Sequence, residues 1–462
     1  MQPARADSPS TPPRWRVPLA VCLAACPFLY LVALLCRYHL DVPYMDQWEF
    51  VLLLEKSYES GVTLGDLWAQ HSEHRLIFPR LIMPALARLS HWDIRWELAA
   101  NVALGVGLFA ALVGQLRATA RRLGIRGTLW LVPLVSLIVF SLSQWQNWFL
   151  GWQLVEFLNV LAVVVGFILL AHPGGGWGRL VAAIAMGIVA TYSFGSGLAF
   201  WPVGFVGLVL VDLGAGGGSA GPAAAKAASP SRARWWVWLA ASCLVVASYG
   251  YGYEPPGYHP SMGLVFARPL EYAVYILTYL GAPVVAYHGP AAAIAGAGGL
   301  ALLGGLAGLL VRRHAVPLAA LAPYLCMGLY AAASAAMTGL GRVGFGADQA
   351  LSSRYVTMAQ LLWISNAVLA YLLASGLGRE ARGTLTRWGF AAAMVLFGLL
   401  LAVNGLYGTL KWTERYAYRL PARAGLLVGN DPELLRRLHP DVEIVKARCE
   451  VLRRHGLSVF RP

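Results

Sequence analysis

Apolar stretches of about 17–25 residues recur along this 462-residue chain, separated by short charged segments. A helix of that length spans the hydrocarbon core of a bilayer. Only 13% of the residues are charged, half of the roughly 25% found in soluble domains, and the mean hydropathy is +0.59. The sequence therefore predicts an all-α polytopic membrane protein.

The net charge of +14 does not indicate a nucleic-acid partner. The basic residues flank the apolar stretches, and no basic soluble region is long enough to grip a duplex. Five of the six cysteines lie in apolar stretches and Cys449 lies in a polar one, so no disulfide framework is expected. "LAAC" at 23–26 matches a lipoprotein cleavage box, but the apolar run before it is shorter than the roughly 7–15 residues of a signal peptide. We expect an uncleaved first helix.

The positive-inside rule orients the chain. It places a tail at 1–16 and a Gly/Ala/Ser/Pro-rich linker at about 213–234 in the cytoplasm. The transmembrane domain is expected at 17–407, with its first loop, about 38–93, outside. Residues 408–462 are expected to form a small helical cap, also outside, because long segments translocate largely regardless of their charge.

Residues 270–287 either cross the membrane or lie in its interface. If they cross, the arginines at 312 and 313 fall outside the cell, against the positive-inside rule. The rule favours no crossing, which gives about 11 transmembrane helices. In this topology the unusual polar clusters all face the outside, which favours one extracytoplasmic site.

The first loop and the residues just after it, from Arg37 to Glu97, gather nine of the 22 acidic residues and four of the ten histidines. The acids are Asp41, Asp46, Glu49, Glu55, Glu59, Asp66, Glu73, Asp93 and Glu97. Carboxylates can deprotonate an acceptor hydroxyl or hold a divalent cation. Asp46 is the candidate catalytic base, with Asp41 and Glu49 as supports, and Asp41 with Asp46 could bind Mg²⁺ or Mn²⁺. The alternative is a loop whose acids are only solvated. The stretch "PYMDQWEF" (43–50) argues against this alternative, because its acids lie among aromatic residues.

Two cationic clusters precede apolar stretches, namely "HSEHRLIFPRL" (71–81) and "SSRY" (352–355). Such clusters suit an anionic head group such as a lipid phosphate. The candidate phosphate-binding residues are His74, Arg75, Arg80, Arg354 and Tyr355. The alternative for the arginines is a snorkelling membrane anchor. The i, i+3 spacing of the two histidines also fits zinc, but a third protein ligand is not evident.

Aromatic and amide side chains accompany these charges. Sugar sites need flat apolar faces beside fixed hydrogen-bonding groups, which makes Trp48, Trp152 and Gln153 candidates for binding a sugar or acceptor. The alternative for the tryptophans is the interfacial aromatic belt. Glu156 lies one turn into an apolar stretch, where an acid costs up to about 2.5–3.5 kcal/mol, so it is expected to face a water-filled cavity.

The layout resembles that of the C-type (GT-C) membrane glycosyltransferases, the superfamily of protein O-mannosyltransferases and lipid A aminoarabinose transferases. "YMDQWEF" is similar to their acidic motif after the first span, "EHRLIFPRL" to the stretch before the second, and "SRY" to a later Arg-Tyr. The resemblance implies transfer of a sugar from a polyprenyl-phosphate carrier, commonly with inversion, to a glycan, lipid or protein acceptor of the cell envelope. It places the reaction on the extracytoplasmic face of the inner (cytoplasmic) membrane, and the 50 Gly with abundant Ala are typical of a high-GC bacterial genome. This chain departs from the motif in having Gln47 after Asp46.

Three other classes fit a polytopic chain. A transporter would place polar groups at the membrane midplane on broken helices, with an internal repeat, and no repeat is evident here. An O-antigen-type polymerase or ligase would carry its main polar loop late in the chain. A non-enzymatic assembly subunit would keep the fold without the activity.

Overall fold

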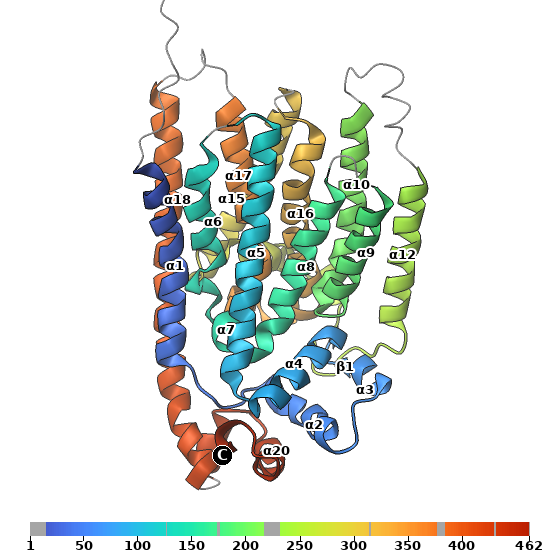
Figure 1. The fold of residues 1–462 in the computed structure, drawn as a ribbon, viewed down its shortest axis with the longest axis vertical. Coiled ribbons are helices and arrows are strands. Elements are labelled where there is room, and N and C mark those ends of the chain that lie inside the picture. Colours follow the sequence, from blue (N-terminus) through green and yellow to red (C-terminus); the bar gives the residue numbers. More distant parts are fainter. Residues whose placement is uncertain are drawn as a thin grey trace, which may run out of the picture.

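The computed structural model describes residues 15–125, 127–172, 176–216, 232–313, 316–376, 384–428 and 431–461. Most of the predicted tail (1–16) and linker (213–234) lies outside these ranges. Long helices run side by side through the molecule (Figure 1). They are α1 (Arg16–Tyr38), α5 (Ile94–Arg122), α6 (Leu131–Val139), α8 (Leu154–Leu170), α9 (Trp177–Thr191), α10 (Phe200–Gly216), α12 (Arg232–Gly250), α15 (Gly289–Arg312), α16 (Leu318–Arg342), α17 (Val356–Gly376) and α18 (Thr384–Val428).

Shorter elements gather at one end of this bundle, which we call the loop end (Figure 1). From the first loop they are α2 (Asp46–Glu59), α3 (Leu64–Trp68), β1 (Gln70–His71), β2 (His74–Arg75) and α4 (Ile77–Ser90). The C-terminal helices α19 (Pro432–Arg436) and α20 (Val442–Arg454) lie against them. The predicted boundary at residue 408 falls inside α18, which continues through Pro421 to Val428 and buries Trp412, Ala422 and Leu426.

Within the described ranges, nine helical segments are long and apolar enough to cross a membrane. The shorter α9 and the more polar α12 run alongside them (Figure 1). A helix satisfies its own backbone hydrogen bonds, which lipid cannot do, so long apolar stretches adopt this form. The prediction of an all-α polytopic membrane protein is therefore confirmed.

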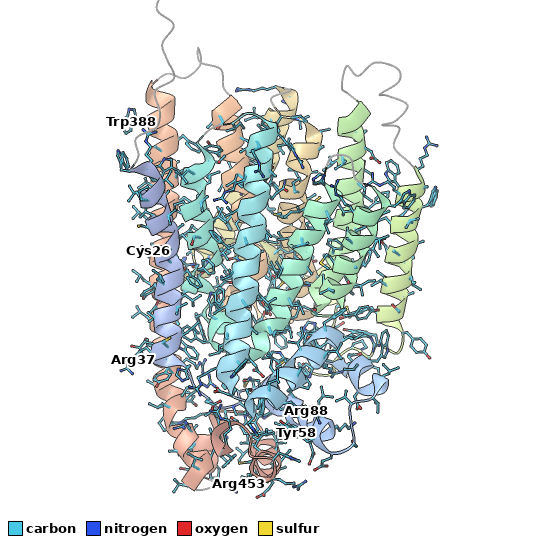
Figure 2. The ribbon with its side chains drawn as sticks, viewed as in Figure 1. Cys26, Arg37, Tyr58, Arg88, Trp388 and Arg453 are labelled. Carbon is cyan, nitrogen blue, oxygen red and sulfur yellow. The ribbon has the colours of Figure 1, made fainter. Side chains whose placement is uncertain are left out.

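The degree of burial separates the outer helices from the inner ones. The apolar parts of α1 and α18 are each only 11% buried, whereas that of α17 is 83% buried. Cys26 on α1 and Trp388 on α18 lie on the outer surface (Figure 2). The surfaces of α1 and α18 therefore suit lipid, and α17 forms the centre of the bundle.

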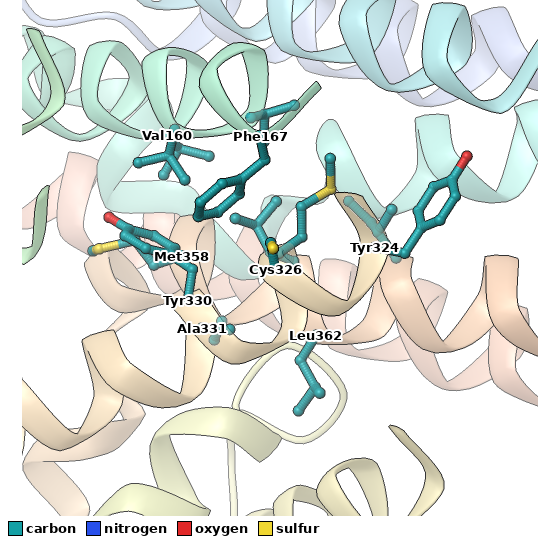
Figure 3. Packing of buried hydrophobic residues seen from close by; sticks show 14 of the residues in the cluster. Val160, Phe167, Tyr324, Cys326, Tyr330, Ala331, Met358 and Leu362 are labelled. Atoms are coloured by element: carbon teal, nitrogen blue, oxygen red, sulfur yellow. The ribbon is translucent and has the colours of Figure 1, made fainter. Parts of the chain in front are cut away.

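Two hydrophobic cores hold the molecule together. The larger core lies inside the bundle, where Phe167, Tyr330 and Met358 pack between α8, α16 and α17 (Figure 3). The second core lies at the loop end and joins the first loop to the C-terminal helices. Its members include Trp48, Phe50, Leu54, Met83, Trp92, Leu435, Leu438, Val445 and Leu452.

The ambiguous stretch 270–287 contains α14 (Pro269–Gly281) and the turn before α15. The hydroxyl of Tyr272 on α14 donates to the carbonyl of Ala336, near the end of α16. The start of α15 also lies at the loop end, because a Cβ on Gly289 would be 2.8 Å from the Asp348 carboxylate. Gly281 and Gly296 bring the two helices so close that a Cβ on either would clash with the other backbone. Helices α14 and α15 thus pack closely against each other, and both of them begin near the loop end.

Candidate functional site

A cavity of about 1190 Å³ lies at the loop end. Its walls come from the first turn of α2, the β1–β2 hairpin, the starts of α8 and α17, and the ends of α12 and α16 with the loop that follows α12. Eight of the twelve predicted site residues line it, namely Asp46, Glu49, His74, Trp152, Gln153, Glu156, Arg354 and Tyr355. Segments far apart in sequence therefore meet at one place.

The other four predicted residues, Asp41, Trp48, Arg75 and Arg80, do not line the cavity. The guanidinium of Arg75 is buried and donates to the backbone carbonyls of Trp68, Tyr249 and Tyr251. Arg80 donates to two carbonyls of the α3 region in the same way. Arg75 thus fastens the first loop to the end of α12, and Arg80 holds α4 against the α3 region within the loop. Neither guanidinium lines the cavity, where a phosphate would bind.

Asp41 and Trp48 also make contacts that stabilise the fold and do not line the cavity. Asp41 pairs with Arg461 and accepts a hydrogen bond from the amide of Ile94 at 3.0 Å. Burial raises the pKa of Asp41 above its ordinary value, although both partners favour the charged form. Trp48 is fully buried in the second core. The structure thus separates Asp41 from Asp46 and does not form the cation site that the sequence suggested for this pair.

Asp46 differs from every other acid of the first loop. The remaining eight, from Asp41 to Glu97, each pair with a basic or hydrogen-bonding side chain. Within the described parts of the chain, the side chain of Asp46 has no hydrogen bond and no ion pair. It is exposed and lines the cavity. Of these nine carboxylates, Asp46 is the one that lines the cavity without a hydrogen bond or ion pair to the described chain.

The backbone around Asp46 is held firmly. Met45, the residue before it, has φ 50° and ψ −119°, an unusual conformation for a side-chain-bearing residue. Gln47 is buried and donates at 2.7 Å to the carboxylate of Glu97, which also accepts from the indole of Trp92. Gln47 therefore points away from the cavity and does not line it. In the described residues no group of three or more His, Cys, Asp or Glu side chains is arranged to hold a metal.

A second carboxylate, Glu73, sits at the tip of the β1–β2 hairpin and also lines the cavity. It pairs with Arg342 at the end of α16, and the hydroxyl of Ser72 donates to it. The Nε2 atoms of His74 and His259 each lie 3.6 Å from its oxygens. Burial opposes ionisation of Glu73, but these neighbours hold its pKa well below the ordinary value. Glu73 is therefore an ionised partner that orients Arg342.

The protonation of His74 follows from its contacts. Its Nδ1 accepts a hydrogen bond from the amide of Gly195 at 3.1 Å, so in the neutral ring the proton is on Nε2, facing Glu73. Burial lowers the pKa of His74 to about 4 despite the nearby carboxylate. The ring stacks on Phe194 with a centroid distance of 4.2 Å. His74 is thus neutral and fixed in orientation at neutral pH.

The opposite wall combines Arg354 and Glu156. Asn147 connects them, because its amide donates to a Glu156 oxygen at 3.1 Å and to the Arg354 carbonyl at 2.8 Å. The Nε of Arg354 is buried and has no hydrogen-bond partner within the described chain. Arg342 lies within electrostatic range of Arg354. Two guanidinium groups therefore face the cavity, and one of them has an unsatisfied donor suited to an anion.

The sequence interpretation did not select Glu73, Arg342 or His259 as site residues. Arg342 ends an apolar stretch, where an arginine is typical of a membrane anchor. His259 lies in a Pro-rich loop that has no periodic pattern. Glu73 offered the best signal, because it lies between the two histidines of "HSEH".

Comparison of the chain with protein-family models, with curated proteins and with solved structures finds no match. A function for the site can therefore be inferred only from the residues that form it.

Proposed function

We propose that the protein is a membrane glycosyltransferase that moves a sugar from a polyprenyl-phosphate carrier to a cell-envelope glycan, lipid or protein acceptor, with inversion. The observation that carries the proposal is the unpaired Asp46 in a large cavity that also contains Arg342 and Arg354. A base beside two cationic groups is what inverting transfer from a phosphate leaving group requires.

The reaction can be written with these residues. Asp46 accepts the proton of the acceptor hydroxyl, and the hydroxyl oxygen forms a bond to the anomeric carbon from the side opposite the phosphate. The bond from that carbon to the phosphate oxygen breaks, and its electron pair leaves with the polyprenyl phosphate. Arg342 and Arg354 stabilise the negative charge that grows on this phosphate. Trp152, Gln153 and Glu156 line the same cavity and supply an apolar ring and hydrogen-bonding groups for the sugar.

The proposal includes a topology of 11 crossing helices in the inner membrane, with the loop end on the extracytoplasmic side. Helix α14 is the short helix that does not cross, an assignment supported by the starts of α14 and α15, which both lie near the loop end. The arginines at the ends of α5 and α15 lie at the opposite end of the bundle, as the positive-inside rule requires of a cytoplasmic face. A cavity at one end of the bundle fits a transferase better than a transporter, whose site lies near the midplane.

The test replaces Asp46 with asparagine, which is nearly isosteric but cannot accept the proton. Purified protein in nanodiscs is supplied with polyprenyl-phosphate-linked hexoses and pentoses and a cell-envelope extract, and release of polyprenyl phosphate is measured by mass spectrometry. We expect Asp46→Asn to lower turnover by about 10²–10⁴-fold. Glu55→Gln is the control, because Glu55 lies on the same helix, pairs with Arg454 and does not line the cavity. Activity of Asp46→Asn within about threefold of the wild type, far below the general-base range, would refute the proposal for this residue.

A further inference from the structure

The last described segment of the chain, residues 431–461, which we call the C-terminal segment, is bound to the acidic first loop by a row of ion pairs. Arg454 pairs with Glu55 and Glu59, both at 3.3 Å. Arg461 pairs with Asp41 and, at 2.6 Å, with Asp93. Much of the acid cluster that marks the first loop in the sequence therefore serves as a docking surface for basic residues more than 360 positions later in the chain.

Apolar packing supports the same docking. Leu435, Leu438, Val445 and Leu452 are buried in the second core against residues of α2 and α4. At its edge, Tyr58 of α2 stacks on His455, with ring centroids 5.2 Å apart, and contacts the guanidinium of Arg88 on its α4 side. Tyr58, Arg88 and Arg453 are labelled in this region of Figure 2. The first loop and the C-terminal segment thus form one packed unit.

Two contacts of the C-terminal segment fall directly on the residues around Asp46. The carbonyl of Leu438 accepts a hydrogen bond at 3.0 Å from the amide of Met45, the strained residue that precedes Asp46. The guanidinium of Arg448 donates at 2.8 Å to the carbonyl of Trp48 and pairs at 3.1 Å with the carboxylate of Glu49. The backbone on both sides of Asp46 is therefore fixed by the far end of the chain.

We propose that the C-terminal segment completes the active site and that Arg448 is a positioning residue for Asp46. The effect on catalysis rests on the proposed function, whereas the effect on the structure of α2 does not. A displacement of a catalytic group by about 1 Å can cost about 10² in rate, so loss of a bidentate contact in the same helical turn is sufficient to impair a base. Glu49, which the sequence assigned to catalysis, then acts as the carboxylate that receives Arg448.

The chain provides a matched control in Arg454. It lies on the same helix as Arg448, carries the same charge and also pairs with glutamates of α2. Its partners lie further along α2, and neither of them lines the cavity. The Arg448 side chain is 13% exposed and that of Arg454 is 59% exposed, so the buried pair is the one at the site.

The experiment compares Arg448→Met and Arg454→Met in nanodiscs by hydrogen exchange and by turnover. We expect Arg448→Met to accelerate amide exchange in residues 45–50 and to lower kcat by about 10–10²-fold with the donor KM within threefold. Arg454→Met should leave exchange at 45–50 and kcat unchanged. Arg448→Lys keeps the positive charge but not the forked guanidinium with its two donor nitrogens. It should therefore retain more activity than Arg448→Met but less than the wild type.

Each outcome has a distinct meaning. Unchanged exchange at 45–50 in Arg448→Met would overturn the inference whatever the enzyme's activity. Faster exchange with full turnover would refute the positioning role while Asp46 could still be the base. If Asp46→Asn is fully active, Asp46 is not the base and the positioning role fails with it, while the exchange result still decides whether the C-terminal segment holds α2. Equal loss of turnover in both methionine variants would indicate a general effect of docking and would contradict a special role for Arg448.

Discussion

Replacing Arg354 with methionine should remove most of the transfer activity without destabilising the protein. The Nε of Arg354 is buried without a hydrogen-bond partner in the described chain, and a buried unsatisfied donor costs about 1–3 kcal/mol. Its contacts with Tyr355, a 3.4 Å hydrogen bond and a guanidinium 5.2 Å from the ring, offset only part of this cost, since an aromatic contact contributes about 0.5–2 kcal/mol. The free energy of unfolding should therefore change by less than about 1 kcal/mol or rise.

Arg75, which the sequence placed in the same role, should behave in the opposite way. Its guanidinium donates to three backbone carbonyls, and each buried acceptor left without a partner costs about 1–3 kcal/mol. Arg75→Met should consequently lower the thermal stability markedly. Turnover per folded molecule should stay within a few-fold of the wild type, because Arg75 does not line the cavity.

The assay measures thermal unfolding and donor consumption on the same nanodisc preparations. For Arg354→Met we expect a loss of about 10²–10³ in turnover, by analogy with removal of one preorganised hydrogen-bond donor, and for Arg354→Lys a smaller but clear defect. Full activity of both Arg354 variants would show that this residue only anchors α17. Marked destabilisation of Arg354→Met would refute the reasoning from its unsatisfied donor.

Two further outcomes follow from the site geometry. Burial lowers the pKa of His74 from 6.5 to about 4. Between these pH values the unfolded chain binds a proton at His74 that the folded protein does not bind. This group should therefore lower the free energy of unfolding by about 3 kcal/mol as the pH decreases from about 6.5 to 4. His74→Gln should flatten that part of the stability profile in a chemical denaturation series, and an unchanged profile would contradict it. In Gly151→Ala the new Cβ would lie 2.0 Å from a Glu97 oxygen, so we expect destabilisation of more than about 2 kcal/mol, whereas Gly114→Ala, with open space at its Cβ, should be neutral or stabilising in the same thermal assay.

The apolar stretches were sufficient to predict the class of fold, because lipid admits few alternatives to the helix. Whether α14 crosses the membrane has one clue in the sequence, the arginines at the end of α15. The side of the membrane on which these arginines lie depends on whether α14 crosses. Helix α18 continues to Val428, past residue 407 where the sequence places the end of the transmembrane domain, since amphipathic sequence continues the helix beyond the apolar stretch. Loss of hydropathy marks the end of a membrane segment but not the end of a helix.

The candidate site was predictable where the chemistry is local and not where it depends on distant partners. Asp46 and Arg354 stand out from the sequence and line the cavity. Arg75 has the same local signal, and only the fold shows that carbonyls near Tyr249 occupy its guanidinium. The large number of acids in the first loop was misleading for the same reason. Basic residues from the other end of the chain pair with them, and the sequence does not show this pairing. Residue type and spacing do not reveal which charges are already paired.

The most direct test of the central claim is a cryo-electron microscopy map of the protein in nanodiscs with a non-hydrolysable polyprenyl-phosphonate sugar. The glycosyltransferase proposal predicts density in the cavity at the loop end, with the phosphonate within hydrogen-bond reach of Arg354 and Arg342 and the sugar between it and Asp46. An empty cavity at saturating ligand, or density confined to the lipid-facing surfaces of α1 and α18, would contradict the proposal.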